Sequence, residues 1–361
     1  MDFVVNATAI SPGGGLTILE QFISYAADTD AHYYVFIAED IEVSASNNIS
    51  IIKRPRMGWL ARILWDAKGL PGYLKKHNIK PQRVISLQNT TANVDYKQIV
   101  YLHQPLPFYD LLTVLRTKKI KLIFYYLFYS FFVFLYDKKD TQYVVQTTWL
   151  KEAVIKKKPK LKNRVYVFRP DNPRFDTTSA GNNVYTKSKV SLFYPAAPYS
   201  YKNHILLLKA LNKVNKDAGG CQLRVTFCKG DFKEFDLLVD KLGLIDNVHY
   251  LGFLDKEALL NEYNSCQAML FPSFIETFGL PLVEAANLGI KILAADLPYA
   301  RETLNGYCGA SFINYSDVES WRSSIAKIIS GKSEKFPPLR DEALARSDWN
   351  VFFEKLVSGE I

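Results

Sequence analysis

The chain has 361 residues, of which 48% are hydrophobic and 22% are charged, a composition typical of a globular protein with two domains rather than one core. The opening residues, MDFVVNATAI, lack the basic region and long apolar stretch of a secretory signal, so we do not expect secretion. The four cysteines have no CxxC or zinc spacing, which excludes a zinc ribbon and predicts free thiols in a reducing, cytoplasmic compartment: Cys221, Cys228, Cys266 and Cys308.

The net charge of +9 is unevenly distributed along the chain. Residues 116–169 carry fourteen Lys/Arg against three Asp/Glu, a net charge of +11, whereas residues 1–115 are neutral and residues 170–361 carry −2. A basic chain rich in aromatic residues could bind nucleic acid, but no recognition motif accompanies the charge. We therefore expect no nucleic-acid partner.

In chain order, the first half of the sequence alternates between apolar runs and segments with helical periodicity. Strands are expected near residues 3–10, 33–38, 83–87, 98–103 and 143–146, and helices near residues 15–27, 59–77, 111–137 and 149–157.

The stretch ISPGGGL follows the first expected strand, so its glycines fall in the first strand-to-helix turn. Glycine lets backbone approach a phosphate or a sugar closely, and the helix that follows offers its N-terminus. The pattern is not G-x-G-x-x-G, because Ile18 occupies the third position, and this disfavours a nicotinamide site. Gly14 and Gly15 are therefore weak candidates for contact with a phosphate or sugar.

The stretch QIVYLHQPLPF places His103 at the end of an expected strand. Residues at the carboxyl ends of parallel strands project toward the ligand in such sheets. A solitary histidine more often satisfies a local hydrogen bond, so position alone does not decide between the two interpretations.

The segment KKIKLIFYYLFYSFFVFLYDKK has the most unusual composition in the chain. Between residues 122 and 136, fourteen of fifteen side chains are apolar or aromatic, and lysines flank both ends. A helix of this length reaches roughly 22 Å, short of the roughly 30 Å hydrocarbon core, so we do not expect it to span a bilayer. Two interpretations remain open: a helix buried in the first domain, or a surface helix that meets an anionic membrane.

Beyond residue 170 a polar stretch rich in Asn, Pro, Gly, Ser and Thr is typical of a linker, and the alternating pattern then restarts. Strands are expected near 190–195, 223–228, 247–251, 268–271 and 291–295, and helices near 202–215, 233–242, 255–264 and 281–288. The chain is thus predicted to be α/β, with two Rossmann-like domains facing across a cleft. The expected boundaries are 1–170 for the first domain, 171–189 for the linker, 190–345 for the second domain, and 346–361 for a C-terminal helix that returns to the first domain.

The stretch FPSFIETFGLPLVEAANLG begins with a short apolar strand and continues into a helix with proline in its first turn. Glu276 is then expected in the loop and Glu284 in about the first turn of the helix. A helix N-terminus at the carboxyl end of a parallel strand is a suitable phosphate site. Taken singly, each acid is more simply explained as a solvated loop acid or as an acid near a helix N-terminus.

This stretch resembles the E-x7-E signature of the GT-B nucleotide-sugar glycosyltransferases, in particular the retaining group called family 4. The resemblance continues through KILAADLPYARETL and extends more weakly to the Gly-rich loop, the histidine and a lysine in FYPAAPYSYKNH. It implies the GT-B fold and transfer of a sugar with retention at the anomeric carbon.

The resemblance also implies roles for single residues. Glu276 would lie beside the donor sugar, and Glu284 would hydrogen-bond the ribose of the nucleotide. Lys202 would neutralise the diphosphate, and His103 would contact the donor sugar. The loop amides at Phe278, Gly279 and Leu280 would hold the diphosphate or sugar, and the loop containing Gly14 and Gly15 would border the donor phosphates and the acceptor.

One position departs from the family pattern. Family members commonly carry an arginine six residues before the lysine, where this chain has Ala196. Either another cation, such as Arg169 or Arg174, substitutes, or fewer charges hold the diphosphate.

Other interpretations of the acids are less consistent with the pattern. The sequence DTD, Asp28 to Asp30, mimics a metal-binding acid pair, but it precedes a strand and is read as a helix-ending turn. A glycosidase needs its two acids to face each other across the scissile bond, which acids flanking one helix start do not do. We therefore expect neither a metal nor another cofactor.

The sequence thus predicts a glycosyltransferase that moves a sugar from a nucleotide-sugar donor to a lipid-linked oligosaccharide in cell-surface polysaccharide assembly of the O-antigen or capsule type. The expected location is the cytoplasm, at the inner face of the cell membrane, with residues 116–169 toward an anionic surface. Two alternatives remain open: a nucleotide-sugar epimerase of the same architecture, and a non-catalytic membrane-associated subunit that binds sugar nucleotides.

Overall fold

The computed structural model describes residues 1–171, 189–217, 220–331, 335–339 and 348–361. The chain forms two compact units. The first comprises Met1–Leu115, Ile120–Asp171 and Arg346–Ile361, and the second comprises Arg116–Lys119 and Asn172–Ala345.

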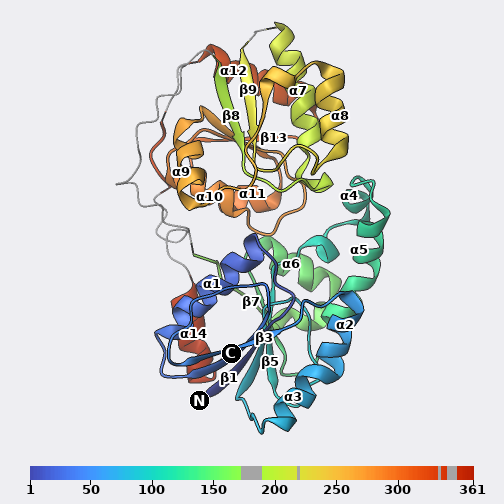
Figure 1. The fold of residues 1–361 in the computed structure, drawn as a ribbon, viewed down its shortest axis with the longest axis vertical. Coiled ribbons are helices and arrows are strands. Elements are labelled where there is room, and N and C mark those ends of the chain that lie inside the picture. The colour runs from blue at the N-terminus through green and yellow to red at the C-terminus, as the bar shows by residue number, and fades with distance from the viewer. Residues whose placement is uncertain (172–188, 218–219, 332–334, 340–347) are drawn as a thin grey trace. The chain divides into compact units, whose positions relative to one another are not determined.

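The first unit contains a seven-stranded parallel sheet in the order β3-β2-β1-β4-β5-β6-β7 (Figure 1). Its strands are β1 (Asp2–Ala7), β2 (His32–Ala38), β3 (Ile49–Arg54), β4 (Arg83–Ser86), β5 (Lys97–Leu102), β6 (Gln142–Val145) and β7 (Val165–Val167). The central strands are buried on both faces, which explains why they appear in the sequence as continuous apolar runs.

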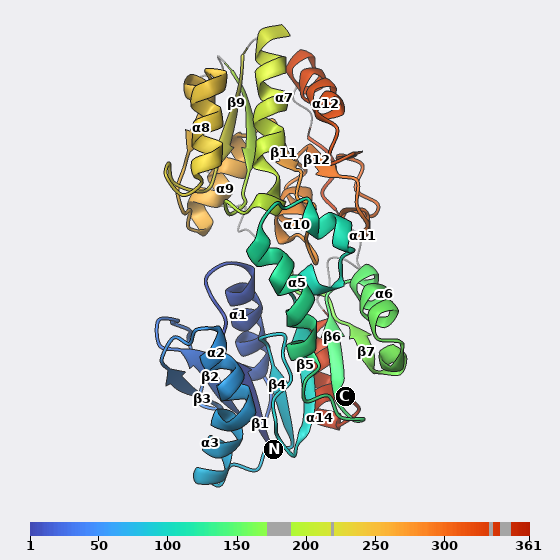
Figure 2. The same cartoon turned by 90° about the vertical axis from the view of Figure 1, so that its right-hand side faces the viewer.

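Helices cover both faces of this sheet. The helices of this unit are α1 (Gly14–Ala27), α2 (Trp59–Leu64), α3 (Leu70–Lys76), α4 (Leu111–Leu115), α5 (Ile120–Val133), α6 (Thr148–Lys157) and α14 (Trp349–Ser358). One apolar core joins α1 and α14 to one face of the sheet, and two further cores join α3, α5 and α6 to the other face (Figures 1 and 2).

The last helix, α14, completes the core of the first unit. Trp349 is fully buried, stacks on Tyr101 with ring centroids 5.5 Å apart, and donates from Nε1 to Gln21 Oε1 at 2.9 Å. The Arg83 guanidinium donates to the Gly359 carbonyl at 2.8 Å. The two ends of the sequence therefore belong to one cooperative core.

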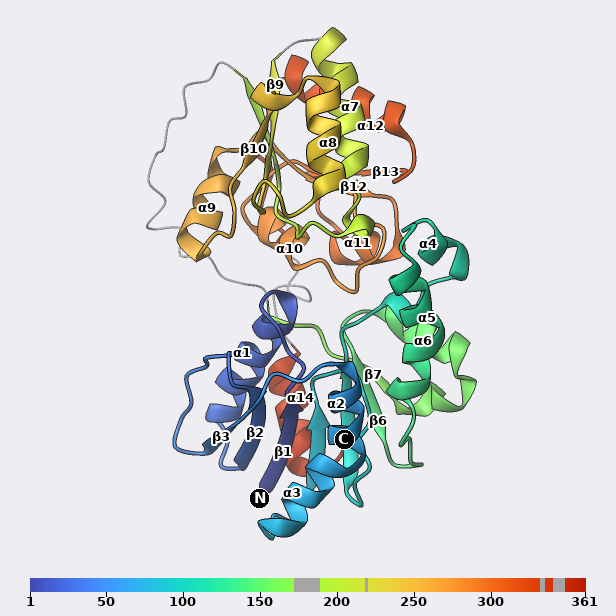
Figure 3. The ribbon, with the colours of Figure 1, turned by 45° about the vertical axis from the view of Figure 1, so that its right-hand side comes forward.

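The second unit contains a six-stranded parallel sheet in the order β10-β9-β8-β11-β12-β13. Its strands are β8 (Val190–Tyr194), β9 (Cys221–Val225), β10 (Val248–Tyr250), β11 (Ala268–Phe271), β12 (Ile292–Ala295) and β13 (Ala310–Ile313). Its helices are α7 (His204–Asp217), α8 (Lys233–Leu242), α9 (Lys256–Ser265), α10 (Leu280–Asn287), α11 (Pro298–Thr303) and α12 (Val318–Ser330). Figure 3 shows α7 and α8 on one face of this sheet and α9 and α10 on the other.

The prediction of two Rossmann-like folds is confirmed, because each sheet has the strand order of a doubly wound fold. The sequence analysis missed the strands β3, β7 and β13 and the helices α11 and α12. β3 and β13 are largely half-exposed edge elements, so they do not appear as apolar runs. The helix expected at 202–215 begins instead at His204.

Two of the expected long helices are interrupted. The run expected at 59–77 contains a π-helical turn, η1 (Trp65–Gly69), between α2 and α3. A Cβ on Gly69 would lie 2.4 Å from the Trp65 ring, so this turn requires glycine. The helix expected at 111–137 breaks between α4 and α5, where Lys118 has a φ of 54°.

The apolar segment at 122–136 is not a buried helix. Most of it forms α5, which buries only Tyr129 and Val133. The interpretation as a buried helix is therefore wrong. No helix in the described part of the chain is long and apolar enough to cross a bilayer.

Trp349→Ala should lower the free energy of unfolding of the first unit by about 3–5 kcal/mol, because it leaves a large cavity among aromatic rings. Val351→Ala on the same helix is the control, since Val351 is exposed and should cost less than about 0.5 kcal/mol. Denaturant titration followed by circular dichroism measures both, and equal effects would contradict the assigned role of Trp349.

Candidate functional site

The candidate residues of the second unit lie where the sheet order reverses, between β8 and β11. These strands are parallel neighbours, so the turns that follow them leave the same edge of the sheet in different directions. Lys202 follows β8 in a short 3-10 turn, η5 (Ser200–Lys202), and Glu276 lies in the loop after β11. Two residues 74 positions apart in sequence are brought together in this way.

Lys202 and Glu276 form an ion pair between Nζ and Oε1. Their side chains are only 17% and 13% exposed, so water screens the pair weakly. Two backbone contacts fix the turn that carries the lysine. The Lys202 carbonyl accepts from Tyr194 Oη at 2.7 Å, and the Phe274 amide donates to the Tyr201 carbonyl at 2.9 Å.

Glu284 lies in the second turn of α10, slightly deeper than expected from the sequence, and is 9% exposed. Tyr263 of α9 donates from its hydroxyl to Glu284 Oε2 at 2.7 Å. Burial raises the pKa of this carboxyl, and the Tyr263 hydrogen bond opposes the rise because it favours the charged form. The sequence analysis did not identify Tyr263, which lies 21 residues before its partner.

The loop before α10 ends in a glycine that the geometry requires. Gly279 has a φ of 79°, a left-handed conformation that strains other residues. Thr303 Oγ1 donates to the Phe278 carbonyl at 2.7 Å and so anchors the loop. No side chain of the described residues caps α10, so the amides near Leu280 point their partial positive charge outward from the helix N-terminus.

Ala196 is buried directly after β8 and brings no charge to this edge. Of the two cations considered as replacements, Arg169 follows β7 in the first unit, where its backbone amide donates to Asp348 Oδ2 at 2.9 Å. Arg174 lies outside the described residues. That another cation takes the place of the family arginine at the diphosphate therefore stays a prediction.

In the first unit Gly14 and Gly15 lie at its own order reversal, between β1 and β4, and His103 follows the next strand, β5. Gly13 precedes α1 with a φ of 107°, and Gly14 and Gly15 are the first two residues of the helix. No side chain of the described residues caps this helix either. A Cβ on Gly15 would lie 3.5 Å from the ring of His103, so the structure brings these two predicted site residues together.

His103 directly follows β5, as predicted, and its ring is fixed by the loop after β4. Its Nε2 lies 2.8 Å from the Leu87 carbonyl, which can only accept, and 3.1 Å from Asn89 Nδ2, which can only donate. The shorter contact favours the tautomer with the proton on Nε2, which leaves Nδ1 as the acceptor nitrogen. Asn89 Oδ1 accepts from the backbone amides of His103 and Gln104 at 2.6 and 2.9 Å. Burial lowers the pKa of the His103 imidazole, so the ring is neutral at physiological pH.

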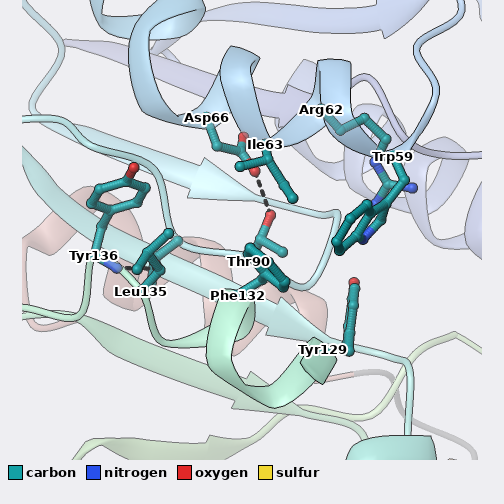
Figure 4. Close-up of a pocket in the computed structure, with 10 residues that line it drawn as sticks. Trp59, Arg62, Ile63, Asp66, Thr90, Tyr129, Phe132, Leu135 and Tyr136 are labelled. Atoms are coloured by element: carbon teal, nitrogen blue, oxygen red, sulfur yellow. Dashed lines mark hydrogen bonds between the residues drawn. The ribbon is translucent and has the colours of Figure 1, made fainter. Parts of the chain in front are cut away.

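A buried acid that the sequence analysis did not single out lies at the same end of the first unit. Asp66, in the π turn, accepts from Asn6 Nδ2 at 2.9 Å and from Gln88 Nε2 at 2.8 Å. It also accepts from Thr90 Oγ1 at 2.8 Å, as Figure 4 shows. Burial raises its pKa from 3.8 to about 6, despite these donors. The network ties the π turn to β1 and to the loop after β4. π-helical turns occur frequently at functional sites. The sequence has no pattern from which this turn could have been predicted.

Comparisons with known proteins agree with this geometry. Residues 175–342 match the model of the family described as glycosyl transferases group 1. The chain is 30% identical over 115 residues to a D-inositol 3-phosphate glycosyltransferase of Mycolicibacterium smegmatis, which covers 31% of the chain and 26% of that protein. It is 33% identical over 91 residues to the O-antigen chain mannosyltransferase RfbU of Salmonella typhimurium, covering 25% of each. These matches span about a quarter of the length of either relative.

Two solved structures share the whole fold. WaaG, a glycosyltransferase involved in lipopolysaccharide biosynthesis, aligns with a TM-score of 0.73 at 17% identity and covers 92% of this chain and 91% of WaaG. HepE of Anabaena, solved with UDP and glucose, aligns with a TM-score of 0.68 at 14% identity and covers 99% of both chains. Residues 175–342 therefore resemble the group 1 glycosyltransferases, and the chain has the GT-B fold.

Tyr263→Phe should raise the pKa of Glu284 further, since it removes the donor that favours the carboxylate. The free energy of unfolding of the second unit should fall by about 1–3 kcal/mol at alkaline pH, and by less where Glu284 is protonated. Carbon-13 NMR titration of labelled glutamate, with Glu284→Gln to assign the signal, measures the pKa. An unchanged titration would contradict the proposed role of the hydroxyl.

Asp66 should make the first unit more stable in mild acid. Its folded-state pKa of about 6 exceeds its ordinary value of 3.8, so the folded state binds the proton more tightly, and stability is lost as the pH rises through this interval. Lowering the pH from 7 to 5 should therefore stabilise the native protein, relative to Asp66→Asn, by about 1.4 kcal/mol. Denaturant titrations at both pH values measure the difference, and parallel pH profiles would contradict the assignment.

Proposed function

We propose that this protein transfers a sugar from a nucleotide-sugar donor to a lipid-linked oligosaccharide, with retention at the anomeric carbon. The observation that carries the proposal is the Lys202–Glu276 ion pair at the β8/β11 reversal. The loop that carries Glu276 leads to the N-terminus of α10, which no described side chain caps. The match of residues 175–342 to the group 1 glycosyltransferases supports it.

The second unit would bind the donor. Glu284 accepts hydrogen bonds from the ribose hydroxyls, and the Tyr263 hydrogen bond holds the carboxylate in place for this. Lys202 and the amides of Phe278, Gly279 and Leu280 face the diphosphate. When the sugar–phosphate bond breaks, negative charge grows on the leaving diphosphate, and fixed cations and amides lower that barrier.

Glu276 and His103 would orient the sugar. Because Lys202 already fixes the Glu276 carboxylate, the acid can accept from a sugar hydroxyl without a large loss of side-chain entropy. His103 is neutral and offers Nδ1 as an acceptor, which suits a positioning role better than proton donation. Gly14 and Gly15 would let the start of α1 approach the donor phosphates and the acceptor.

In the proposed step, the bond from the anomeric carbon to the phosphate oxygen breaks, and a bond to the acceptor oxygen forms on the same face. The proton of the acceptor hydroxyl passes to the departing phosphate oxygen. The transition state resembles an oxocarbenium ion, which the leaving diphosphate stabilises electrostatically. Lys202 and the loop amides supply the positive charge, so we propose no metal or other cofactor.

The acceptor and location are proposed from charge and from the relatives. The net charge of +11 on residues 116–169 would hold the protein at an anionic membrane surface, on the cytoplasmic face. Two similar proteins are described as acting in O-antigen chain and lipopolysaccharide synthesis. Assembly of a cell-surface polysaccharide on a lipid carrier fits both observations.

Calorimetric titration with UDP, GDP, dTDP, ADP and NAD tests the donor site. One nucleoside diphosphate should bind, and Glu284→Ala should weaken it by about tenfold or more through loss of a charged hydrogen-bond acceptor. Glu257→Ala, an exposed glutamate on α9, is the matched control and should bind normally. Binding of NAD alone, or of none of the five, would overturn the proposed donor site.

Transfer assays with the matching nucleotide sugar and membrane lipid extract test the chemistry. Glu276→Ala and Lys202→Ala should each lower kcat by about 10²- to 10³-fold, and EDTA should have no effect. Release of an altered free nucleotide sugar without acceptor would instead identify an epimerase. Donor binding without any turnover would identify a non-catalytic subunit.

A further inference from the structure

The helix α5 carries a complete apolar stripe on its outer side. A helix that is apolar all round is normally buried, yet α5 buries one side only. Its outward side chains follow the spacing i, i+4, i+7, i+8, i+11, and each is between 53% and 72% exposed: Ile120, Phe124, Leu127, Phe128 and Phe131. A contiguous stripe of this size on a protein surface marks an interaction site.

The same surface continues onto α2, which lies far from α5 in sequence. Trp59 packs edge-on against Phe132, with ring centroids 5.1 Å apart, and this contact joins the two helices. Figure 4 shows both rings at the seam between α2 and α5. Leu60 and Leu64 of α2 are 69% and 62% exposed, and Trp59 is 48% exposed. We call the exposed residues of α2 and α5 the two-helix surface.

Positive charge borders the two-helix surface at the start of α5. Lys118, Lys119 and Lys121 are exposed, and none of them forms an ion pair with another described residue. By contrast, Lys138, at the other end of the segment, pairs with Asp95. A protein partner with an apolar face would not require unpaired lysines at the edge, whereas anionic lipid headgroups do attract them.

We propose that the two-helix surface seats in the boundary between the headgroups and acyl chains of an anionic bilayer, with α2 contributing alongside α5. Aromatic side chains favour this depth, and α5, at 14 residues or roughly 21 Å, is too short to span the core. The basic segment 116–169 does not include α2, so the proposal enlarges the membrane-facing part of the protein. This proposal rests on the proposed function in one respect, because a lipid-linked acceptor requires access to a bilayer.

Co-sedimentation of the full chain with vesicles of phosphatidylglycerol and phosphatidylcholine tests the proposal. Phe124→Ser with Phe128→Ser, and separately Leu60→Ser with Leu64→Ser, should each weaken binding by about tenfold or more. Leu237→Ser with Phe253→Ser is the matched control, because these side chains of the second unit are 70% and 89% exposed. It should bind vesicles like the native protein.

Two further measurements separate insertion from simple attraction. Lys118, Lys119 and Lys121 changed together to Gln should lower binding to phosphatidylglycerol vesicles by about tenfold and weaken its dependence on salt. Lipids brominated in the acyl chain should quench the tryptophan fluorescence of the native protein. The Trp59→Phe variant should lose most of this quenching.

Other results of these experiments would each contradict one part of the proposed membrane binding. Normal binding by the Leu60/Leu64 variant would remove α2 from the surface. If only the lysine variant lost vesicle binding, the protein would be held by electrostatic attraction to the headgroups, without insertion of apolar side chains. A dimer that dissociates in the Phe124/Phe128 variant, without vesicle binding, would assign the surface to a second copy of the chain. Nucleotide binding, measured on the same variants, should be unchanged, so failure at the membrane and failure of the donor site remain distinguishable.

Discussion

Both halves of this protein depend on one constraint of parallel sheets, the reversal of strand order at the first strand. In the first unit β1 lies between β2 and β4, and in the second unit β8 lies between β9 and β11. The connections on either side must run in opposite directions, so the turns after these strands separate and leave the edge of the sheet open. Each opening has a helix N-terminus that no side chain in the described ranges caps, α1 in one unit and α10 in the other. In each unit taken by itself, candidate polar groups lie at this opening, where backbone amides are available.

The polar groups at these openings are held by buried partners rather than by solvent. Lys202 pairs with Glu276, Tyr263 donates to Glu284, and Asn89 fixes the backbone at His103. Such fixed arrangements have an energetic cost, since burial raises the pKa of Glu284 and lowers that of His103. In the proposed reaction the same fixed geometry would serve catalysis, because charges that need not reorganise stabilise a transition state more effectively.

In the first unit, large apolar side chains lie both in the core and on the surface. The C-terminal helix α14 contributes Trp349 and its neighbours to a dry aromatic core, so the ends of the chain close one sheet. On the other face, α5 keeps a stripe of large apolar side chains in contact with solvent. A protein that uses a lipid-linked acceptor has a reason to retain such a stripe, since binding to a bilayer would bury it.

The sequence by itself determined the alternation of strands and helices, the positions of β11 and α10, and the loop carrying Glu276. These features depend on local signals: apolar runs indicate the strands, and Gly279 and Pro281 mark the start of the helix. It also placed His103 at the end of β5. Tertiary structure alone decided the Lys202–Glu276 pair, the Tyr263 partner of Glu284 and the buried Asp66, because these contacts join segments that strand order brings together. It also decided which side of α5 is exposed: a helix with apolar residues all round has no periodicity from which its outer face could be inferred.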